Sequence, residues 1–185
     1  MAAVPYIDDN RVTSAVRILL VEDFEPFRRL VCSTLRNKTG LQVVGEVFDG
    51  LEAVQKAAEL QPDLVLLDIG LPTLNGIEAA RRIRNLAPKS KIIFVSQESS
   101  SAIVQEAFAL GACGYVAKTK VSSDLLPAVE AVRQGRQFVS DGLLGRNCSG
   151  VTDALLSGFP TQSLSPVAGG DIDRADVCHP FDRQL

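Results

Sequence analysis

The sequence predicts an α/β protein built on a doubly wound, five-stranded parallel sheet with helices on both faces. Two observations lead to this class. Short apolar runs rich in branched residues alternate with segments of helical periodicity, and the alternation repeats five times between residues 16 and 138. Parallel neighbours in a sheet need a crossover of helical length, and such crossovers cover both faces of the sheet.

The first three strand-and-helix units lie before Pro88. Residues 16–21, 41–48 and 63–67 are short runs with many branched side chains, so we expect each to form a buried strand. Apolar residues recur at spacings of three and four after each run and outline helices within 27–35, 51–58 and 77–83. Gly40, Pro62 and Pro88 separate the units.

The last two units complete the sheet. Residues 91–95 and 114–117 predict the fourth and fifth strands, and residues 103–110 and 125–132 predict the helices after them. Ser122 or Ser123 is a candidate cap for the last helix. We therefore divide the chain into an N-terminal extension (1–15), a folded domain (16–138), and a linker with a poorly ordered tail (139–185) that lacks any sustained period.

Composition limits the function. The 185 residues carry 19 Lys and Arg against 22 Asp and Glu, a net charge of −3 without the basic excess of a nucleic-acid-coating protein. Hydrophobic residues make up 46%, enough for a core, yet no apolar run approaches the ~18 residues of a membrane-spanning helix. The first ten residues lack the order of a secretory signal, so we expect a cytoplasmic protein.

The four cysteines and the single histidine indicate neither a metal site nor a disulfide framework. Cys32, Cys113, Cys148 and Cys178 contain no CxxC pair, which a zinc ribbon or a redox motif requires. We therefore expect reduced thiols. His179 follows Cys178, and a single pair of this kind is a weak sign of metal binding.

Charged and polar side chains follow four of the predicted strands. Glu22 and Asp23 come after the first strand, Asp68 after the third, Ser96 after the fourth and Lys118 after the fifth. The carboxyl ends of the strands in a doubly wound sheet share one edge, and ligands bind there. We therefore expect these side chains to meet.

The chemistry of this set favours a hard divalent cation. Neighbouring carboxylates repel one another unless a cation lies among them, and oxygen ligands without Cys or His suit Mg²⁺. Asp68, at the end of the most hydrophobic strand, is the best candidate nucleophile, and Lys118 can neutralise phosphoryl oxygens. Taken singly, each residue has an ordinary explanation, such as a helix cap for Asp23 and a solvated side chain for Lys118.

Five segments, in this order, resemble the receiver domain of two-component response regulators. They are LLVED (19–23), LLDIGLP (66–72), NG (75–76), VS (95–96) and GYVAK (114–118). The resemblance covers residues 16–138 and implies the flavodoxin-like strand order 2-1-3-4-5.

The resemblance also implies the chemistry of the strand-end residues. Asp68 would accept a phosphoryl group from a sensor histidine kinase. Glu22, Asp23, Asp68 and the main-chain carbonyl of Gly70 would bind Mg²⁺ or Mn²⁺.

The remaining positions would contact the phosphoryl group or report its presence. Lys118 and Ser96 would bind the phosphoryl oxygens, with Lys118 sharing the catalysis of the transfer with Asp68. Ser96 and Tyr115 would form the switch pair, and the alternative for Tyr115 is a half-exposed packing residue. Gly70 and Gln97 are expected to influence the lifetime of the acyl phosphate.

The resemblance implies protein partners. Residues 125–144 are similar to the end of receivers that carry a LuxR-type helix-turn-helix, but residues 145–185 have no helical period, so nucleic-acid binding is not expected. Without a long apolar run, no membrane partner is expected either. Either the protein is a stand-alone receiver or the sequence stops before an output domain. A homodimer through the fourth helix, fifth strand and fifth helix is a further expectation.

The resemblance implies a phosphoacceptor whose only reactions are its own phosphorylation and autodephosphorylation. Two other functions stay open. A haloacid-dehalogenase-like phosphatase also uses a strand-end Asp and Mg²⁺, but it needs a second Asp two residues later, where this chain has Gly70. A pseudo-receiver would serve only as a docking or dimerising module. We therefore expect a signalling domain rather than a turnover enzyme.

Overall fold

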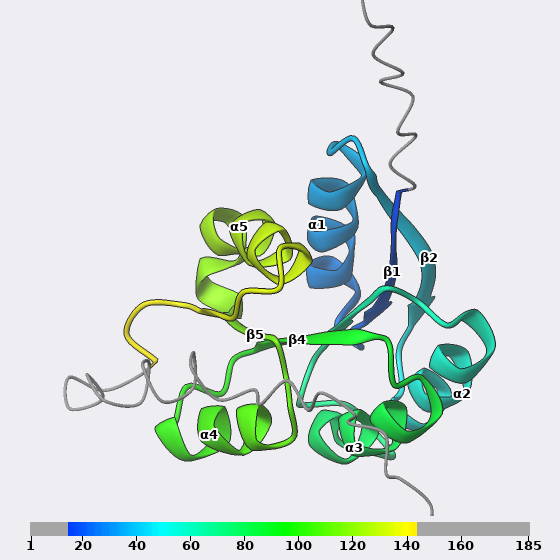
Figure 1. Cartoon of the computed structure of the whole chain (residues 1–185). Coiled ribbons are helices and arrows are strands. Elements are labelled where there is room, and N and C mark those ends of the chain that lie inside the picture. The colour runs from blue at the N-terminus through cyan, green and yellow to red at the C-terminus, as the bar shows by residue number, and fades with distance from the viewer. Residues whose placement is uncertain (1–14, 144–185) are drawn as a thin grey trace, which may run out of the picture.

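The computed structural model describes residues 15–143, which form one sheet with helices on both faces (Figure 1). The strands are β1 (Val16–Val21), β2 (Leu41–Val47), β3 (Leu64–Leu67), β4 (Lys91–Ser96), β5 (Gly114–Ala117) and β6 (Phe138–Val139). The helices are α1 (Glu25–Arg36), α2 (Gly50–Leu60), α3 (Gly76–Leu86), α4 (Ser101–Ala109), the 3₁₀ turn η1 (Lys118–Lys120) and α5 (Val121–Arg133). The predicted fold class is confirmed.

All strands of this sheet are parallel, and their order is β2-β1-β3-β4-β5-β6. The predicted order of the first five is therefore confirmed, and β6 is an addition. It was not predicted because two residues are too few to show a period. The packed chain continues past the expected boundary at Phe138, since Ser140 and Leu143 are both buried. The predictions for 1–14 and 144–185 lie outside the described residues.

Successive side chains of each central strand enter two separate cores. Leu19 and Val21 of β1 pack in the core under α2, α3 and α4, while Ile18 and Leu20 pack in the core under α1 and α5. Because a strand alternates its side chains between faces, both faces of β1 are apolar and both are covered. Figure 1 shows α1 and α5 on one side of the sheet and α3 and α4 on the other.

The helix starts differ from expectation in one place. Asp49, Asn75 and Ser100 cap α2, α3 and α4 through side-chain oxygens that accept backbone N–H groups. The predicted cap of α5 by Ser122 or Ser123 is wrong, because this helix continues directly from η1 and begins at Val121.

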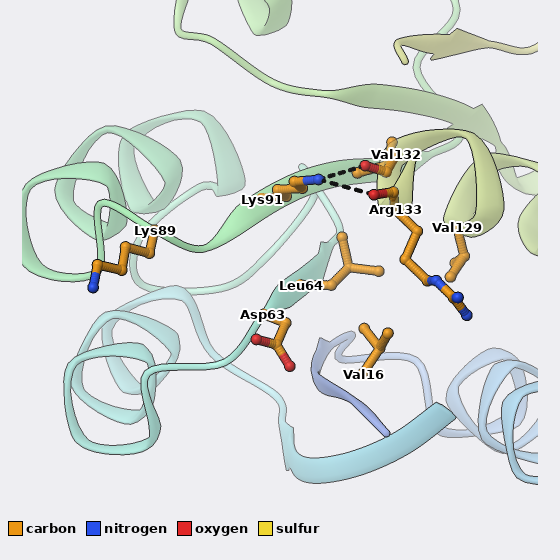
Figure 2. A pocket seen from close by; sticks show the side chains of 8 residues that line it. All are labelled: Val16, Asp63, Leu64, Lys89, Lys91, Val129, Val132 and Arg133. Atoms are coloured by element: carbon orange, nitrogen blue, oxygen red, sulfur yellow. Dashed lines mark hydrogen bonds between the residues drawn. The ribbon is translucent and has the colours of Figure 1, made fainter. Parts of the chain in front are cut away.

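The amino ends of the strands are tied to helix C-termini by cations. Lys91 Nζ donates to the carbonyls of Val132 and Arg133 at the end of α5, over 2.6 and 3.4 Å (Figure 2). A cation in this position satisfies carbonyls that the helix leaves unpaired. The cavity drawn in Figure 2, about 300 Å³, is lined by the first residues of β1, β3 and β4 and by α5, and contains none of the predicted site residues.

Two expectations concern what the described chain contains. Cys32 is buried and Cys113 is partly buried, and both are free thiols. Cys148, Cys178 and His179 lie outside the described residues. Within 15–143, no helix combines the length and apolar character that crossing a bilayer requires.

Candidate functional site

The carboxyl ends of β1, β3 and β5 bring Glu22, Asp68 and Lys118 together. Lys118 Nζ donates to Glu22 Oε1 and to Asp68 Oδ2, each over 2.8 Å. Lys118 lies 96 and 50 positions from these two acids in the sequence. The parallel sheet alone places all three strand ends at one edge, so the expected convergence of these residues is observed.

The acidic residues of this cluster differ in exposure. Glu22 is 1% exposed and Asp68 is 5% exposed, while Asp23 is open to solvent. One carboxylate oxygen from each of these three residues lies within 4.8 Å of the others. Within the described residues, Lys118 is the only cation that hydrogen-bonds to the carboxylates of this trio, so the three carboxylates carry surplus negative charge. A group of carboxylate oxygens with surplus negative charge, open to solvent on the side of Asp23, suits a hard divalent cation such as Mg²⁺.

Burial and charge shift the ionisation of this cluster. Burial, with the nearby charge of Asp68, raises the pKa of Glu22, although the hydrogen bond from Lys118 opposes this rise. Burial tends to lower the pKa of Lys118, but its hydrogen bonds to Asp68 and Glu22 outweigh that effect and raise it. Lys118 therefore stays charged at neutral pH. Its Nζ also makes a cation–π contact, 4.9 Å from the centre of the Phe27 ring.

The loop after β3 holds Asp68 firmly. Its Oδ1 accepts the N–H of Ile69 over 2.7 Å, and its own N–H donates to the carbonyl of Val21 over 3.0 Å. A Cβ placed on Gly76 would lie 2.0 Å from the Asp68 carbonyl oxygen, so only glycine allows α3 to begin this close. Gly70 is exposed, and a Cβ placed there would lie 3.6 Å from Asp68 Oδ2, so its backbone lies beside the carboxylate.

Ser96 and Tyr115 both contact the loop after β4. Ser96 is 2% exposed, and its Oγ accepts the N–H of Glu98 over 3.1 Å. The Tyr115 hydroxyl donates to the carbonyl of the same Glu98 over 2.9 Å. Tyr115 is fully buried and not half-exposed as the packing alternative expected, and burial raises the pKa of its hydroxyl to about 12.

Arg28 supports the site and was not predicted from the sequence. Its Nη1 donates to the carbonyls of Glu22 and Asp23 over 3.1 and 3.5 Å, and its guanidinium lies 4.1 Å from the centre of the Phe48 ring. Arg28 thereby joins the loop that carries the two acids to the end of β2. No local pattern marks this arginine, because Arg29 beside it points to solvent and looks identical in sequence.

Comparisons with known proteins agree with this geometry. Residues 18–130 match the response regulator receiver domain. The chemotaxis protein CheY of Thermotoga maritima is 38% identical over 116 residues, which cover 63% of this chain and 96% of CheY. Response regulator GacA of Pseudomonas viridiflava is 32% identical over 125 residues, covering 68% of this chain but only 58% of GacA. The chain thus spans little more than half of this longer relative.

Solved structures give the same result. A LuxR-family response regulator from Aurantimonas sp. SI85-9A1 is 35% identical with a TM-score of 0.67, covering 70% of this chain and 93% of that one. The response regulator domain of Thermotoga maritima CheB is 36% identical with a TM-score of 0.58, covering 65% and 95%. With its sheet order, its acidic strand-end cluster and these matches, the chain belongs to the response regulator receiver family.

Proposed function

We propose that this receiver accepts a phosphoryl group on Asp68 from the phosphohistidine of a sensor histidine kinase, with Mg²⁺ bound beside it. The observation that carries the proposal is the partly buried Lys118 ammonium bridging Asp68 and Glu22, with a carboxylate oxygen of the exposed Asp23 within 4.8 Å of an oxygen of each acid. A lone structural ion pair would need one acid, and this cluster has three.

The metal would be held by Glu22, Asp23 and Asp68 and by the main-chain carbonyl of Gly70. Receiver domains bind Mg²⁺ at an acidic pocket, and the carboxylate oxygens here provide a donor set of that kind. When bound, the ion supplies positive charge that offsets the repulsion between the acids and the incoming phosphoryl oxygens. Mn²⁺ prefers the same oxygen ligands and would substitute.

The transfer forms a bond between a carboxylate oxygen of Asp68 and phosphorus, and breaks the bond between phosphorus and the kinase histidine nitrogen. Both Asp68 oxygens are engaged before the reaction, Oδ1 by Ile69 N–H and Oδ2 by Lys118. We assign the attack to Oδ2, since a side-chain ammonium can turn from this oxygen to the phosphoryl oxygens, whereas the Ile69 N–H on Oδ1 belongs to the backbone. At the phosphoryl oxygens, the Lys118 ammonium stabilises the negative charge that the transition state spreads over them.

Ser96 and Tyr115 would convert the new phosphoryl group into a change of surface. The Ser96 hydroxyl would leave Glu98 N–H and donate to a phosphoryl oxygen, which changes the loop after β4. Tyr115 is bonded to the same loop through the Glu98 carbonyl, so the two residues respond together. The result is a shift between two surface states, with no released product.

The test is phosphorylation of the whole chain by acetyl phosphate with Mg²⁺, followed by intact mass. We expect an adduct of about 80 Da that hydroxylamine removes, as an acyl phosphate should be. Asp68→Asn should give no adduct, while Asp63→Asn, a matched change at the amino end of the same strand, should leave it unchanged. Omitting the metal or adding EDTA should abolish it.

The other outcomes identify the alternatives. Absence of the adduct in the unmodified chain would leave a pseudo-receiver that only docks or dimerises. Continuous hydrolysis of phosphate esters would indicate a turnover phosphatase instead of a signalling domain. The same proposal includes docking of a kinase, which phosphoryl transfer from a phosphorylated kinase domain measures. It also includes a homodimer through α4, β5 and α5, which sedimentation with and without a phosphoryl donor measures.

A further inference from the structure

We propose that Ser140 is a positioning residue that ties the segment 138–143 to the strand end carrying Lys118, so that phosphorylation at Asp68 changes how firmly this segment is held. The tie itself stands on hydrogen bonds alone. The link to phosphorylation rests on the proposed function.

Ser140 is a buried polar residue in the segment that follows the last helix of the domain. It is 1% exposed, although it lies beyond β6. Its Oγ donates to Asp124 Oδ2 over 2.6 Å and accepts the N–H of Ala117 over 3.2 Å, while its own N–H donates to the Tyr115 carbonyl over 2.9 Å. A buried hydroxyl that both donates and accepts is fully satisfied, and losing either partner leaves a buried polar group unpaired.

The partners of Ser140 connect it to the site. Ala117 is the last residue of β5, and its amide group immediately precedes Lys118 in the chain. Asp124 lies in the first turn of α5, directly after the 3₁₀ turn that starts at Lys118. Ser140 therefore bridges the backbone before Lys118 and the helix after it.

A second contact joins the same two segments. Lys120 Nζ donates to the Asp141 carbonyl over 3.0 Å. Asp124 also accepts the Ser123 hydroxyl over 2.6 Å, and the two serine hydroxyls lower its pKa, so it is ionised and a strong acceptor at neutral pH. The bonds of Ser140 to Ala117 and Asp124, and that of Lys120 to Asp141, hold residues 140 and 141 against the turn that contains Lys118.

The consequence concerns movement of Lys118. Its ammonium binds Asp68 and Glu22 before the reaction and must re-aim at the phosphoryl oxygens afterwards. Any accompanying shift of the 117–120 backbone acts directly on the hydrogen bonds of Ser140. This route to residues 138–143 runs through the start of α5 and does not require the side chains of Ser96 and Tyr115.

The test is amide hydrogen exchange on the whole chain, with beryllofluoride and Mg²⁺ as a stand-in for the phosphoryl group. Ser140→Ala should raise the exchange rates of the Ala117 and Ser140 amides about tenfold, the effect of a hydrogen bond worth roughly 1 kcal/mol or slightly more. Ser123→Ala removes an exposed hydroxyl from the same Asp124 and should change these rates less than twofold. Ser140→Thr keeps the hydroxyl and should restore protection.

Amides of β3 report whether each variant is folded. Should Ser140→Ala fail that check, Asp124→Asn, which keeps the shape and removes the charge, should raise exchange at Ser140 severalfold. Unchanged exchange in the folded variant would overturn the tie.

The link to phosphorylation has its own readout. Beryllofluoride should change exchange at Ser140 in the unmodified chain, and by reciprocity Ser140→Ala should shift the beryllofluoride midpoint severalfold while Ser123→Ala does not. Binding of beryllofluoride with no change at Ser140 would refute the link alone. Failure of the unmodified chain to bind beryllofluoride would refute the proposed function, and with it the link to phosphorylation. The exchange rates measured without beryllofluoride would still test whether Ser140 holds the segment 138–143.

Discussion

The two ends of the sheet use charge in opposite ways. At the amino end, Arg17 Nη1 donates to the Leu60 and Gln61 carbonyls that end α2, and Lys91 Nζ donates to the carbonyls that end α5. At the carboxyl end, Lys118 donates to two carboxylates and to no backbone group in the described chain. Cations at the amino end thus bind helix C-termini, while at the carboxyl end the Lys118 ammonium binds two of three clustered carboxylates.

This contrast distinguishes charged side chains that stabilise the fold from charged side chains that are available to bind a ligand. A cation on helix carbonyls is satisfied by the protein itself and needs no ligand. Lys118 neutralises the acidic cluster only in part, so a bound divalent cation would reduce the remaining repulsion between the carboxylates. The phosphoryl chemistry proposed above depends on that cation. Charge balance, more than burial, distinguishes the two ends.

The largest expected effect comes from removing one cation at each end. Lys118→Met leaves Glu22 and Asp68 as unpaired buried acids and should lower the free energy of unfolding by about 3–5 kcal/mol without metal. Lys91→Met loses hydrogen bonds to carbonyls and should cost about 2 kcal/mol. Urea unfolding with and without Mg²⁺ measures both, and Mg²⁺ should recover part of the loss only in Lys118→Met. Equal losses in the two variants would contradict the contrast between the ends.

Mg²⁺ should stabilise the protein through the carboxyl end alone. At a concentration of 100 times its dissociation constant, a ligand of the folded state adds about 2.7 kcal/mol to the free energy of unfolding. Asp68→Asn should reduce this gain, whereas Asp63→Asn, at the amino end of β3, should keep it. Thermal melts over a Mg²⁺ series give the comparison, and a gain that survives in Asp68→Asn would place the ion elsewhere.

Two glycines test how the loop after β3 holds the acid. Gly76→Ala would place a Cβ 2.0 Å from the Asp68 carbonyl oxygen, so it should cost about 1–3 kcal/mol and slow adduct formation. Gly70→Ala meets an ordinary contact of 3.6 Å and should cost less than about 0.5 kcal/mol. Chemical denaturation and acetyl phosphate kinetics distinguish them, and similar behaviour of both variants would argue against a steric constraint at Gly76.

A smaller effect than that of Gly76→Ala is expected at neutral pH for the Tyr115 hydroxyl. Tyr115→Phe loses its hydrogen bond to the Glu98 carbonyl and should cost about 1 kcal/mol. Since burial raises the pKa of Tyr115 to about 12 from 10, the unfolded chain releases this proton first, and stability should fall as the pH rises from 10 to 12. Denaturation at pH 8 and pH 11 should show that the free energy of unfolding falls less between these pH values in the variant than in the unmodified chain. An equal fall in both would mean that Tyr115 does not cause it.

The residues of the candidate site were predictable because strand ends are a local property. Apolar runs of four to six residues mark β1, β3 and β5, and the first polar residue after each run marks where it ends. Parallel pairing then places Asp68, Glu22 and Lys118 at one edge whatever the details of packing. The sequence by itself therefore determined the fold class, the strand order implied by its resemblance, and the members of the acidic cluster.

Tertiary structure alone decided which other side chains support that cluster. The contact of Arg28 with the Phe48 ring, the hydrogen bond of Tyr115 to Glu98, and the bonds of Ser140 to Ala117 and Asp124 each join different elements of the fold. No period or spacing encodes such contacts, because they depend on rotamers and on helix positions that the two cores fix together.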